Sequence, residues 1–273
     1  EAIAGSFLQR FSLFCLFIVP LIIDKRIKSR ILIVILFCLI FFSIGIAGNR
    51  MPLILFLLTI MLSVFLLKDL RKHLLLLIIL ITLVFSILYN LNSNLKTHYG
   101  AFVVRAHTII SSILQNKIDA ENPGWLFHGH FKEFYAGYET WKENKIFGEG
   151  VKSFKLNCPK TGIKNFVPHP HNYYLEIMAD LGLIGLAFIS IIYINVLLLS
   201  FLNIKKYNNE KGYPLVLCVF LTLFFAELFP IKTTGSFFTT GNATYLFFII
   251  AVLVSLLDKE KYDIKSLSGL KKN

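Results

Sequence analysis

The chain has 273 residues, of which 56% are hydrophobic and 16% are charged, and its mean hydropathy is +0.68. About a quarter of the residues in a soluble domain are charged, so this composition excludes an ordinary soluble protein and predicts a polytopic membrane protein. The net charge of +12 would suit a nucleic-acid-binding protein, but the basic residues gather in short connectors between apolar runs, and this distribution excludes that class and indicates membrane topology.

The apolar runs predict seven membrane-spanning helices. They cover residues 7–23, 31–47, 51–67, 74–90, 182–202, 213–230 and 243–257. The connectors "DKRIKSR", "KDLRKH" and "NIKKYNNEKG" and the tail from Asp258 are rich in Lys and Arg. Basic connectors lie on the cytoplasmic face, and seven alternating spans place all four there. Because the chain starts beside an apolar run and shows no signal peptide, we expect it to be a piece of a longer protein with helices before Glu1.

These spans divide the chain into four parts. Residues 1–90 hold the first four spans, 91–172 form a large outer segment, 173–257 hold the last three spans, and 258–273 form a basic cytoplasmic tail. In the outer segment, residues 99–116 and 131–144 have helical spacing, and the second stretch carries an aromatic stripe. The stripe consists of Phe131, Phe134, Tyr135, Tyr138 and Trp141. It is either a packed or lipid-facing surface, or a surface on which sugars stack.

Four polar groups meet at the outer face in this topology. Arg10 lies about one turn below the outer surface, Arg50 stands in the outer turn before Pro52, Glu227 is near the outer end of the sixth span, and His171 leads into the fifth. Ionisable residues in a membrane usually mark function, although an Arg at a helix end also reaches out to lipid headgroups. Arginine suits phosphate or diphosphate because its planar fork donates two hydrogen bonds.

The stretch "VPHPHNYYLEIMADLGLIG" (167–185) leaves three alternatives open. In the structural one, His171 or Asn172 caps the helix that follows, and the glycines join this helix to the membrane span. In the second, "HGH" (128–130) and "HPH" (169–171) hold a metal, but neither has i, i+4 spacing and the chain has no HExxH motif. In the third, a neutral imidazole acts as a general base.

The stretch "HNYYLEIMADLGLIG" (171–185) resembles the His-[Asn/Ser/Gln]-x9-Gly-x-x-Gly signature of the O-antigen ligase family, which shares a superfamily with the O-antigen polymerases. The matching residues are His171, Asn172, Gly182 and Gly185. "ETWKENKIFGEGVKSF" (139–154) resembles the family's stretch before this motif. "GIAGNRMPLIL" (45–55) resembles its Ser-Arg-Gly-like turn, with Arg50 in the Arg position, although Asn49 and Met51 depart from the family's small residue and Gly.

The resemblance implies a GT-C-like all-helical membrane protein with a large periplasmic loop in the bacterial inner membrane. It implies an inverting, metal-independent glycosyltransferase of lipopolysaccharide biosynthesis, whose donor is a glycan on undecaprenyl diphosphate and which needs no cofactor. His171 is then the candidate base and Arg50 the candidate diphosphate ligand. Arg105 is a candidate replacement for an Arg that relatives carry before the aromatic helix, where this chain has "HGHF". The other substrate-binding candidates are Arg10, His169, Asn172 and Glu227.

Three functions remain open from the sequence. A ligase would transfer the glycan to a lipid A core, whereas a polymerase would transfer it to another lipid-linked repeat. A transporter or flippase of the lipid-linked glycan would need the outer arginines but no His base. A protease is a poorer alternative, because the chain has neither a GxSxG nor an HExxH motif. The expected partners are the lipid-linked donor, a lipid- or sugar-linked acceptor and the bilayer.

Overall fold

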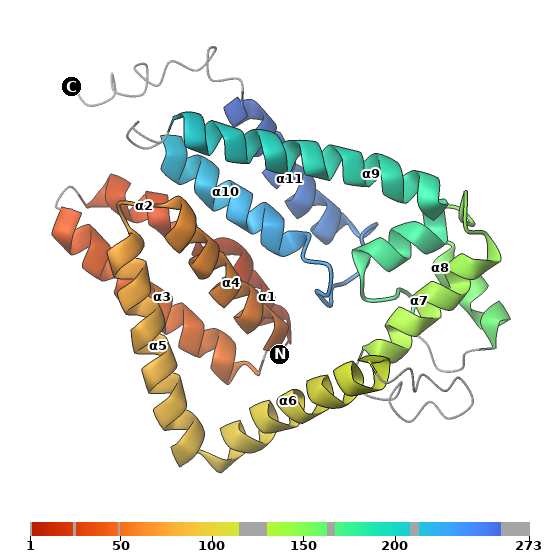
Figure 1. Ribbon diagram of the computed structural model, residues 1–273, viewed down its shortest axis with the longest axis horizontal. Coiled ribbons are helices and arrows are strands. Elements are labelled where there is room, and N and C mark those ends of the chain that lie inside the picture. The colour runs from red at the N-terminus through yellow and green to blue at the C-terminus, as the bar shows by residue number, and fades with distance from the viewer. Residues whose placement is uncertain are drawn as a thin grey trace.

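The computed structural model describes residues 2–23, 26–48, 50–114, 130–162, 167–207 and 213–257, and within these ranges the protein is helical without strands. The helices are α1 (Ala2–Ser12), α2 (Cys15–Ile22), α3 (Arg26–Ile46), α4 (Arg50–Leu66), α5 (Arg71–Leu91), α6 (Ser93–Leu114), α7 (Phe131–Glu143), α8 (Phe154–Asn157), a 3-10 helix (Cys158–Thr161), α9 (Tyr173–Lys206), α10 (Tyr213–Glu227) and α11 (Thr240–Leu257) (Figure 1). Helices satisfy their own backbone polar groups, as a chain in lipid requires.

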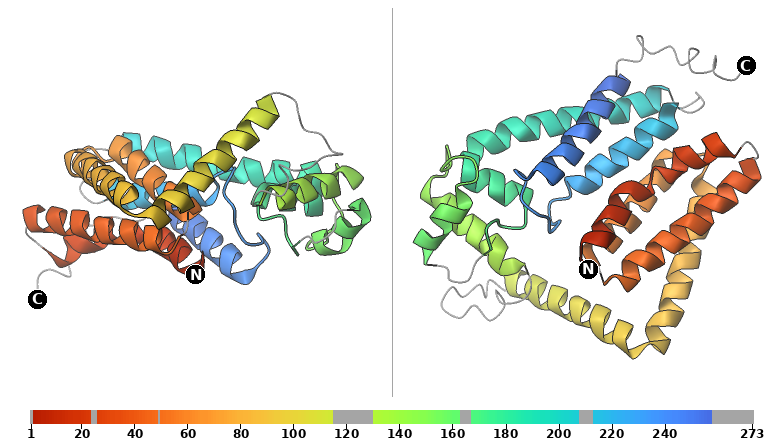
Figure 2. Two further views of the ribbon diagram at one scale, coloured as in Figure 1. Left: turned by 90° about the horizontal axis from the view of Figure 1, so that it is seen from below. Right: turned by 180° about the vertical axis from the view of Figure 1, so that it is seen from behind.

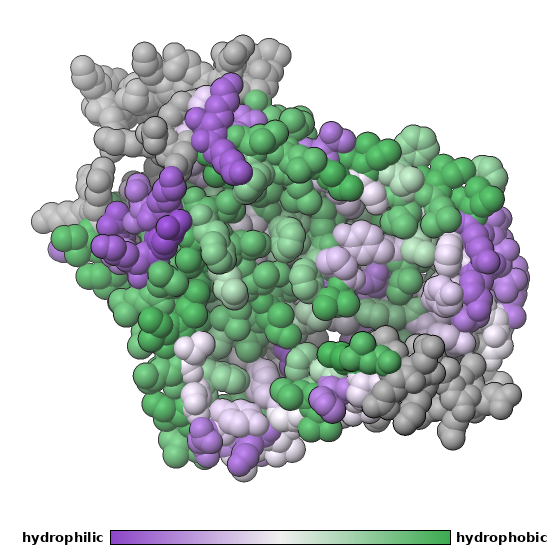
Figure 3. Space-filling model, viewed as in Figure 1, coloured by the Kyte–Doolittle hydropathy of each residue, from purple (hydrophilic) through white to green (hydrophobic). Residues whose placement is uncertain are grey.

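Four of the described helices are long and apolar enough to cross a membrane: α3, α5, α9 and α11. The apolar helices α4 and α10 have 17 and 15 residues and are shorter than a full span. The first predicted span, 7–23, contains parts of α1 and α2, separated by a turn at 13–14. Apolar residues cover the middle of the bundle in Figure 3, and hydrophilic ones gather at its ends. The protein is therefore a multi-pass membrane protein, and the number of seven spans stays a prediction.

Helix α10 lies at the centre of the bundle. It contacts α2 and α4 on one side and α9 and α11 on the other, so it joins the N-terminal helices to the C-terminal ones. Its side chains are buried along almost its whole length, and those of Leu217, Cys218 and Phe224 have no exposed surface. Apolar residues all around a helix are what such a central position needs.

Helix α5 packs against α3 and α4, with Leu74, Leu77 and Ile81 buried in the core, whereas α6 extends away from the core (Figure 2). Helices α5 and α6 meet at a sharp bend near Asn92 (Figure 1). The predicted helix at 99–116 lies in α6 up to Leu114, beyond which 115–116 are outside the described residues, and the predicted helix at 131–144 is α7. Of these two helices, α7 packs against α9, whereas α6 packs against α5.

Helix α7 packs through small residues. Ala136, Gly137 and Thr140 are buried against the rest of the protein, whereas the five aromatic side chains are half-buried or exposed. Tyr138, for example, is 44% exposed. The aromatic stripe is therefore not the face that packs in the core, because close approach of α7 to α9 requires residues without bulk.

Candidate functional site

Helix α9 is broken at Gly182, as the sequence predicted for the joint between loop helix and membrane helix. Gly182 has φ +66° and ψ −167°, and a Cβ atom there would lie 2.2 Å from the carbonyl oxygen of Ile146. Only glycine takes this conformation without strain, and only glycine fits this contact. The amides of Leu183 and Ile184 donate instead to the carbonyls of Lys145 (2.9 Å) and Ile146 (3.2 Å).

The "GEG" turn (148–150) packs against the same kink. Gly148 has φ +68°, and a Cβ atom there would lie 2.4 Å from the backbone of Asp180. The carboxylate of Asp180 accepts hydrogen bonds from the amides of Lys152 (2.6 Å) and Phe154 (3.0 Å) and from the Ser153 hydroxyl (3.0 Å). Two of the three stretches that carry the family resemblance, 139–154 and 171–185, therefore form one folded unit.

Asn172 caps the first half of α9. Its Oδ1 accepts from the amides of Tyr174 (3.0 Å) and Leu175 (3.2 Å), and its Nδ2 donates to the carbonyl of Pro230 (2.7 Å). Of the two predicted capping candidates, the cap is thus Asn172. His171, just before the cap, has φ +53°, a conformation that costs a non-glycine residue about 1 kcal/mol or more and that is concentrated at functional sites.

The His171 ring is oriented by a backbone carbonyl. Its Nδ1 lies 2.8 Å from the carbonyl oxygen of Thr234, and the Thr234 amide donates to the His171 carbonyl, also at 2.8 Å. A carbonyl oxygen only accepts, so Nδ1 carries the proton in this contact. In the neutral ring Nε2 then holds the free lone pair, which is the form that a general base needs.

The loop that carries Thr234 is held by a second carboxylate. Glu176, which is 3% exposed, accepts from the Ser236 hydroxyl and the Phe237 amide, both at 2.5 Å. The Tyr174 hydroxyl donates to the carbonyl of Leu228 at 2.5 Å. Glu176 was not among the residues predicted from the sequence. The signal was present, because an acidic residue in a largely apolar stretch that leads into a membrane helix is costly unless it is paired.

Two further imidazoles flank His171. The ring centroids of His130 and His169 lie 4.5 Å and 4.4 Å from that of His171. Burial, and then the nearby His171, lower the pKa of both flanking rings below the ordinary value, so both are mainly neutral at pH 7. Of the predicted metal ligands, His128 lies outside the described residues, and the described part of the chain contains no group of three or more side chains placed to hold a metal.

Glu227 is the centre of a buried ion cluster. Its carboxylate accepts from Arg10 Nη2 (2.6 Å) and Nε (3.2 Å), from Lys232 Nζ (2.6 Å) and from the Tyr173 hydroxyl (2.8 Å). Arg10 also donates to Asn242 Oδ1 at 2.9 Å. Glu227 is 2% exposed and Lys232 6% exposed. Two cations around one carboxylate give the cluster a surplus positive charge. One of the two is Lys232, which was not predicted from the sequence.

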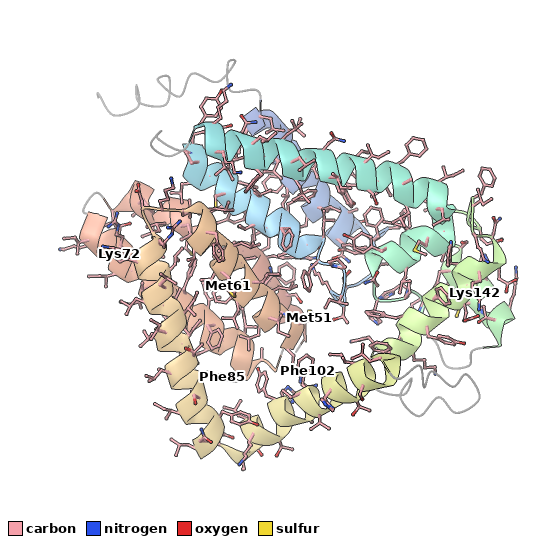
Figure 4. All side chains as sticks on the ribbon, in the orientation of Figure 1. Met51, Met61, Lys72, Phe85, Phe102 and Lys142 are labelled. Atoms are coloured by element: carbon pink, nitrogen blue, oxygen red, sulfur yellow. The ribbon has the colours of Figure 1, made fainter. Side chains whose placement is uncertain are left out.

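Arg50 is the first residue of α4, which confirms its predicted place at a helix N-terminus. Its Nε and Nη2 both lie 3.1 Å from ring nitrogens of His98, and its guanidinium lies 5.7 Å from the ring centroid of Phe102. These partners belong to α6, on which Figure 4 marks Phe102. Within the described residues the contacts of Arg50 are thus with α6 and not with the His171 group. The side chain of Arg105, also on α6, lies outside the described part.

The structure therefore brings together two groups of the predicted residues. His169, His171 and Asn172 lie where α7, the start of α9 and the α10–α11 loop meet, and the loop links them to Glu227 and Arg10 through Lys232. Arg50 belongs to a separate group at the start of α4.

Comparison with known proteins agrees with the motifs in this site. The O-antigen ligase family matches residues 32–190, more than half of the chain, and the match includes both Arg50 and the segment 171–185. No curated protein and no solved structure matches significantly. The chain therefore belongs to the O-antigen ligase family, whose members carry out glycosyl transfer on lipid-linked glycans in a membrane.

Proposed function

We propose that the protein transfers a glycan from undecaprenyl diphosphate to an acceptor sugar, with His171 as the general base. The observation that carries this proposal is the hydrogen bond from His171 Nδ1 to the Thr234 carbonyl, because it leaves Nε2 free to take a proton. The strained backbone of His171 and its fixed ring orientation support the same role. The site then faces the periplasm, in a GT-C-like bundle with residues 91–172 as its outer loop.

The proposed reaction is a single inverting displacement. His171 Nε2 takes the proton of an acceptor hydroxyl, and the oxygen forms a bond to the anomeric carbon of the donor glycan. The bond from this carbon to the diphosphate oxygen breaks, and its electron pair leaves with undecaprenyl diphosphate. His171 then loses its proton to water. The negative charge at the leaving group is spread over the diphosphate, so the main electrostatic task is to hold that group. The residues in the proposal need no metal for any of these steps.

Arg50 is the proposed diphosphate ligand. It is the first residue of α4, and the backbone amides at a helix N-terminus add to the positive potential of the guanidinium. Arg10 and Lys232 offer a second positive region, and Glu227 aligns both cations. In the same proposal Arg105 is a further phosphate ligand, while His169 and Asn172 contact the substrate or orient His171.

Reconstitution of the purified protein in liposomes tests the function. With an undecaprenyl-diphosphate-linked glycan as donor, we expect a new glycosidic bond, which His171→Ala abolishes and His73→Ala, on α5, leaves unchanged. Transfer to a lipid A core identifies a ligase, and transfer to a second lipid-linked repeat identifies a polymerase. Movement of the donor across the bilayer without bond formation would identify a flippase and overturn the proposal.

A further inference from the structure

One face of α7 is turned towards the "HPH" segment (169–171). His130, at the N-terminus of α7, and Glu133 and Gly137 within it are separated by three and four residues, so they share a helix face. Gly137 fixes where this face points, because a Cβ atom there would lie 2.8 Å from the Cβ of Pro170 and 3.1 Å from that of Leu175. Glu133 therefore lies one helical turn from the point at which α7 touches the segment between His169 and His171.

Two buried polar atoms in this contact region have no hydrogen-bond partner. They are Oε2 of Glu133 and Nε2 of His169. Buried polar atoms are nearly always paired, and an unpaired one costs roughly 1–3 kcal/mol. The Glu133 carboxylate is near enough to act on the pKa of both His130 and His169. It raises the pKa of each ring, but burial lowers the same pKa by more. The two unpaired atoms and the two neutral imidazoles thus belong to one region beside His171.

The chemistry of this region fits hydroxyl groups. A carboxylate oxygen accepts from a hydroxyl, and a neutral imidazole accepts through one ring nitrogen and donates through the other. A sugar ring presents several hydroxyls side by side, so a sugar bound by one of them at His171 places the next ones against the neighbouring groups. Groups that are paired only when the ligand is present are what a preorganised binding site contains.

We propose that Glu133, His169 and His130 form the subsite for the acceptor sugar, beside the base His171. The inference rests on the proposed function, in which His171 deprotonates an acceptor hydroxyl. The subsite is assigned to the acceptor and not to the donor glycan, because the hydroxyl that contacts His171 belongs to the acceptor. The neighbouring hydroxyls of the same sugar ring then lie beside His171. Glu133 and His130 come from the outer segment, so that segment would take part in the choice of acceptor.

The test compares Glu133→Gln and His169→Gln with the wild-type protein in liposomes, with kcat and KM determined separately for the donor and for the acceptor that the wild type glycosylates. Loss of one hydrogen bond to a sugar hydroxyl corresponds to up to about a tenfold effect. We expect the acceptor KM to rise about tenfold in each variant while the donor KM stays unchanged. Glu139→Gln is the matched control, because Glu139 is on α7 but is paired with Lys142, at 2.8 Å, on another face.

Thermal unfolding of the free variants separates binding from folding. Because Glu133 Oε2 and His169 Nε2 have no protein partner, neither substitution should lower the unfolding temperature, whereas loss of a structural contact would. An unchanged acceptor KM in both variants overturns the subsite, and so does a rise in the donor KM alone. If the wild type forms no glycosidic bond, the proposed function fails by itself. Equilibrium binding of the free core oligosaccharide then tests the subsite, since equal affinity of wild type and Glu133→Gln overturns it.

Discussion

His171 and Thr234 are joined by two hydrogen bonds of 2.8 Å that run in opposite directions. The imidazole Nδ1 donates to the Thr234 carbonyl, and the Thr234 amide donates to the His171 carbonyl. The two residues are 63 positions apart in the sequence, and Thr234 belongs to the loop between α10 and α11. The tautomer of the proposed base therefore depends on the backbone of a distant loop.

Thr234→Pro should lower the rate of glycan transfer because it removes the amide that donates to His171. Loss of this hydrogen bond, worth about 1 kcal/mol, and the shift of the carbonyl beside it should together lower kcat about tenfold or more. Thr234→Val keeps the backbone amide and carbonyl and should retain most of the activity. The comparison is made on reconstituted protein at equal amounts. An equal loss of kcat in both variants would mean that the side chain, and not the backbone, supports His171.

Local features of the site could be predicted from the sequence. Gly182 marks the break in α9, because a glycine in an otherwise continuous helical stretch often supplies a positive φ. Asn172 caps α9 with the side chain that sequence patterns favour at this position. Apolar runs of sufficient length predicted the four described helices that are long and apolar enough to cross a membrane. Each of these features depends on residues that are close in the sequence.

Long-range contacts could not be predicted in the same way. Arg10 and Glu227 are 217 positions apart, and their place on one predicted membrane face did not show that they form a buried pair. Lys232, which also contacts the Glu227 carboxylate at 2.6 Å, carries no motif that would single it out in the sequence. The packing face of α7 is a related case: α7 approaches α9 through Ala136 and Gly137, which the sequence pattern did not single out. A lipid-facing or sugar-stacking role of the aromatic stripe stays a prediction.

Gly148 and Gly150 should respond differently to alanine. Both have positive φ, which costs alanine about 1 kcal/mol. At Gly148 the new Cβ atom would also lie 2.4 Å from the backbone of Asp180, whereas at Gly150 it would meet no atom within 4 Å. We therefore expect Gly148→Ala to lower the unfolding temperature much more than Gly150→Ala, as measured by thermal unfolding in detergent. Similar shifts in both variants would indicate that the turn moves freely relative to α9.

Glu227→Gln should be strongly destabilising. The substitution leaves the side chains of Arg10 and Lys232 without the carboxylate that both contact at 2.6 Å. Breaking a buried ion pair by removal of one partner costs about 3–5 kcal/mol. The Glu139–Lys142 pair provides a control of the same chemistry at the surface, where Glu139→Gln should change the unfolding temperature little. If the two variants are equally stable, water reaches the Glu227 cluster and compensates for the loss of the carboxylate.

Acidification should destabilise the protein through His130 and His169. Burial lowers the pKa of both rings below the ordinary value of 6.5, with His171 and Glu133 as the nearby titratable groups. At a pH between the lowered pKa and 6.5, the unfolded chain binds more protons than the folded one. The free energy of unfolding therefore falls as the pH falls through this window. Above pH 6.5 these two groups add no pH dependence. The unfolding temperature should therefore drop as the pH is lowered from about 7 to below 6.5, and less so in the double variant His130→Asn, His169→Asn. If the double variant keeps the full pH dependence of the wild type, other groups cause that dependence, because the variant lacks both imidazole rings.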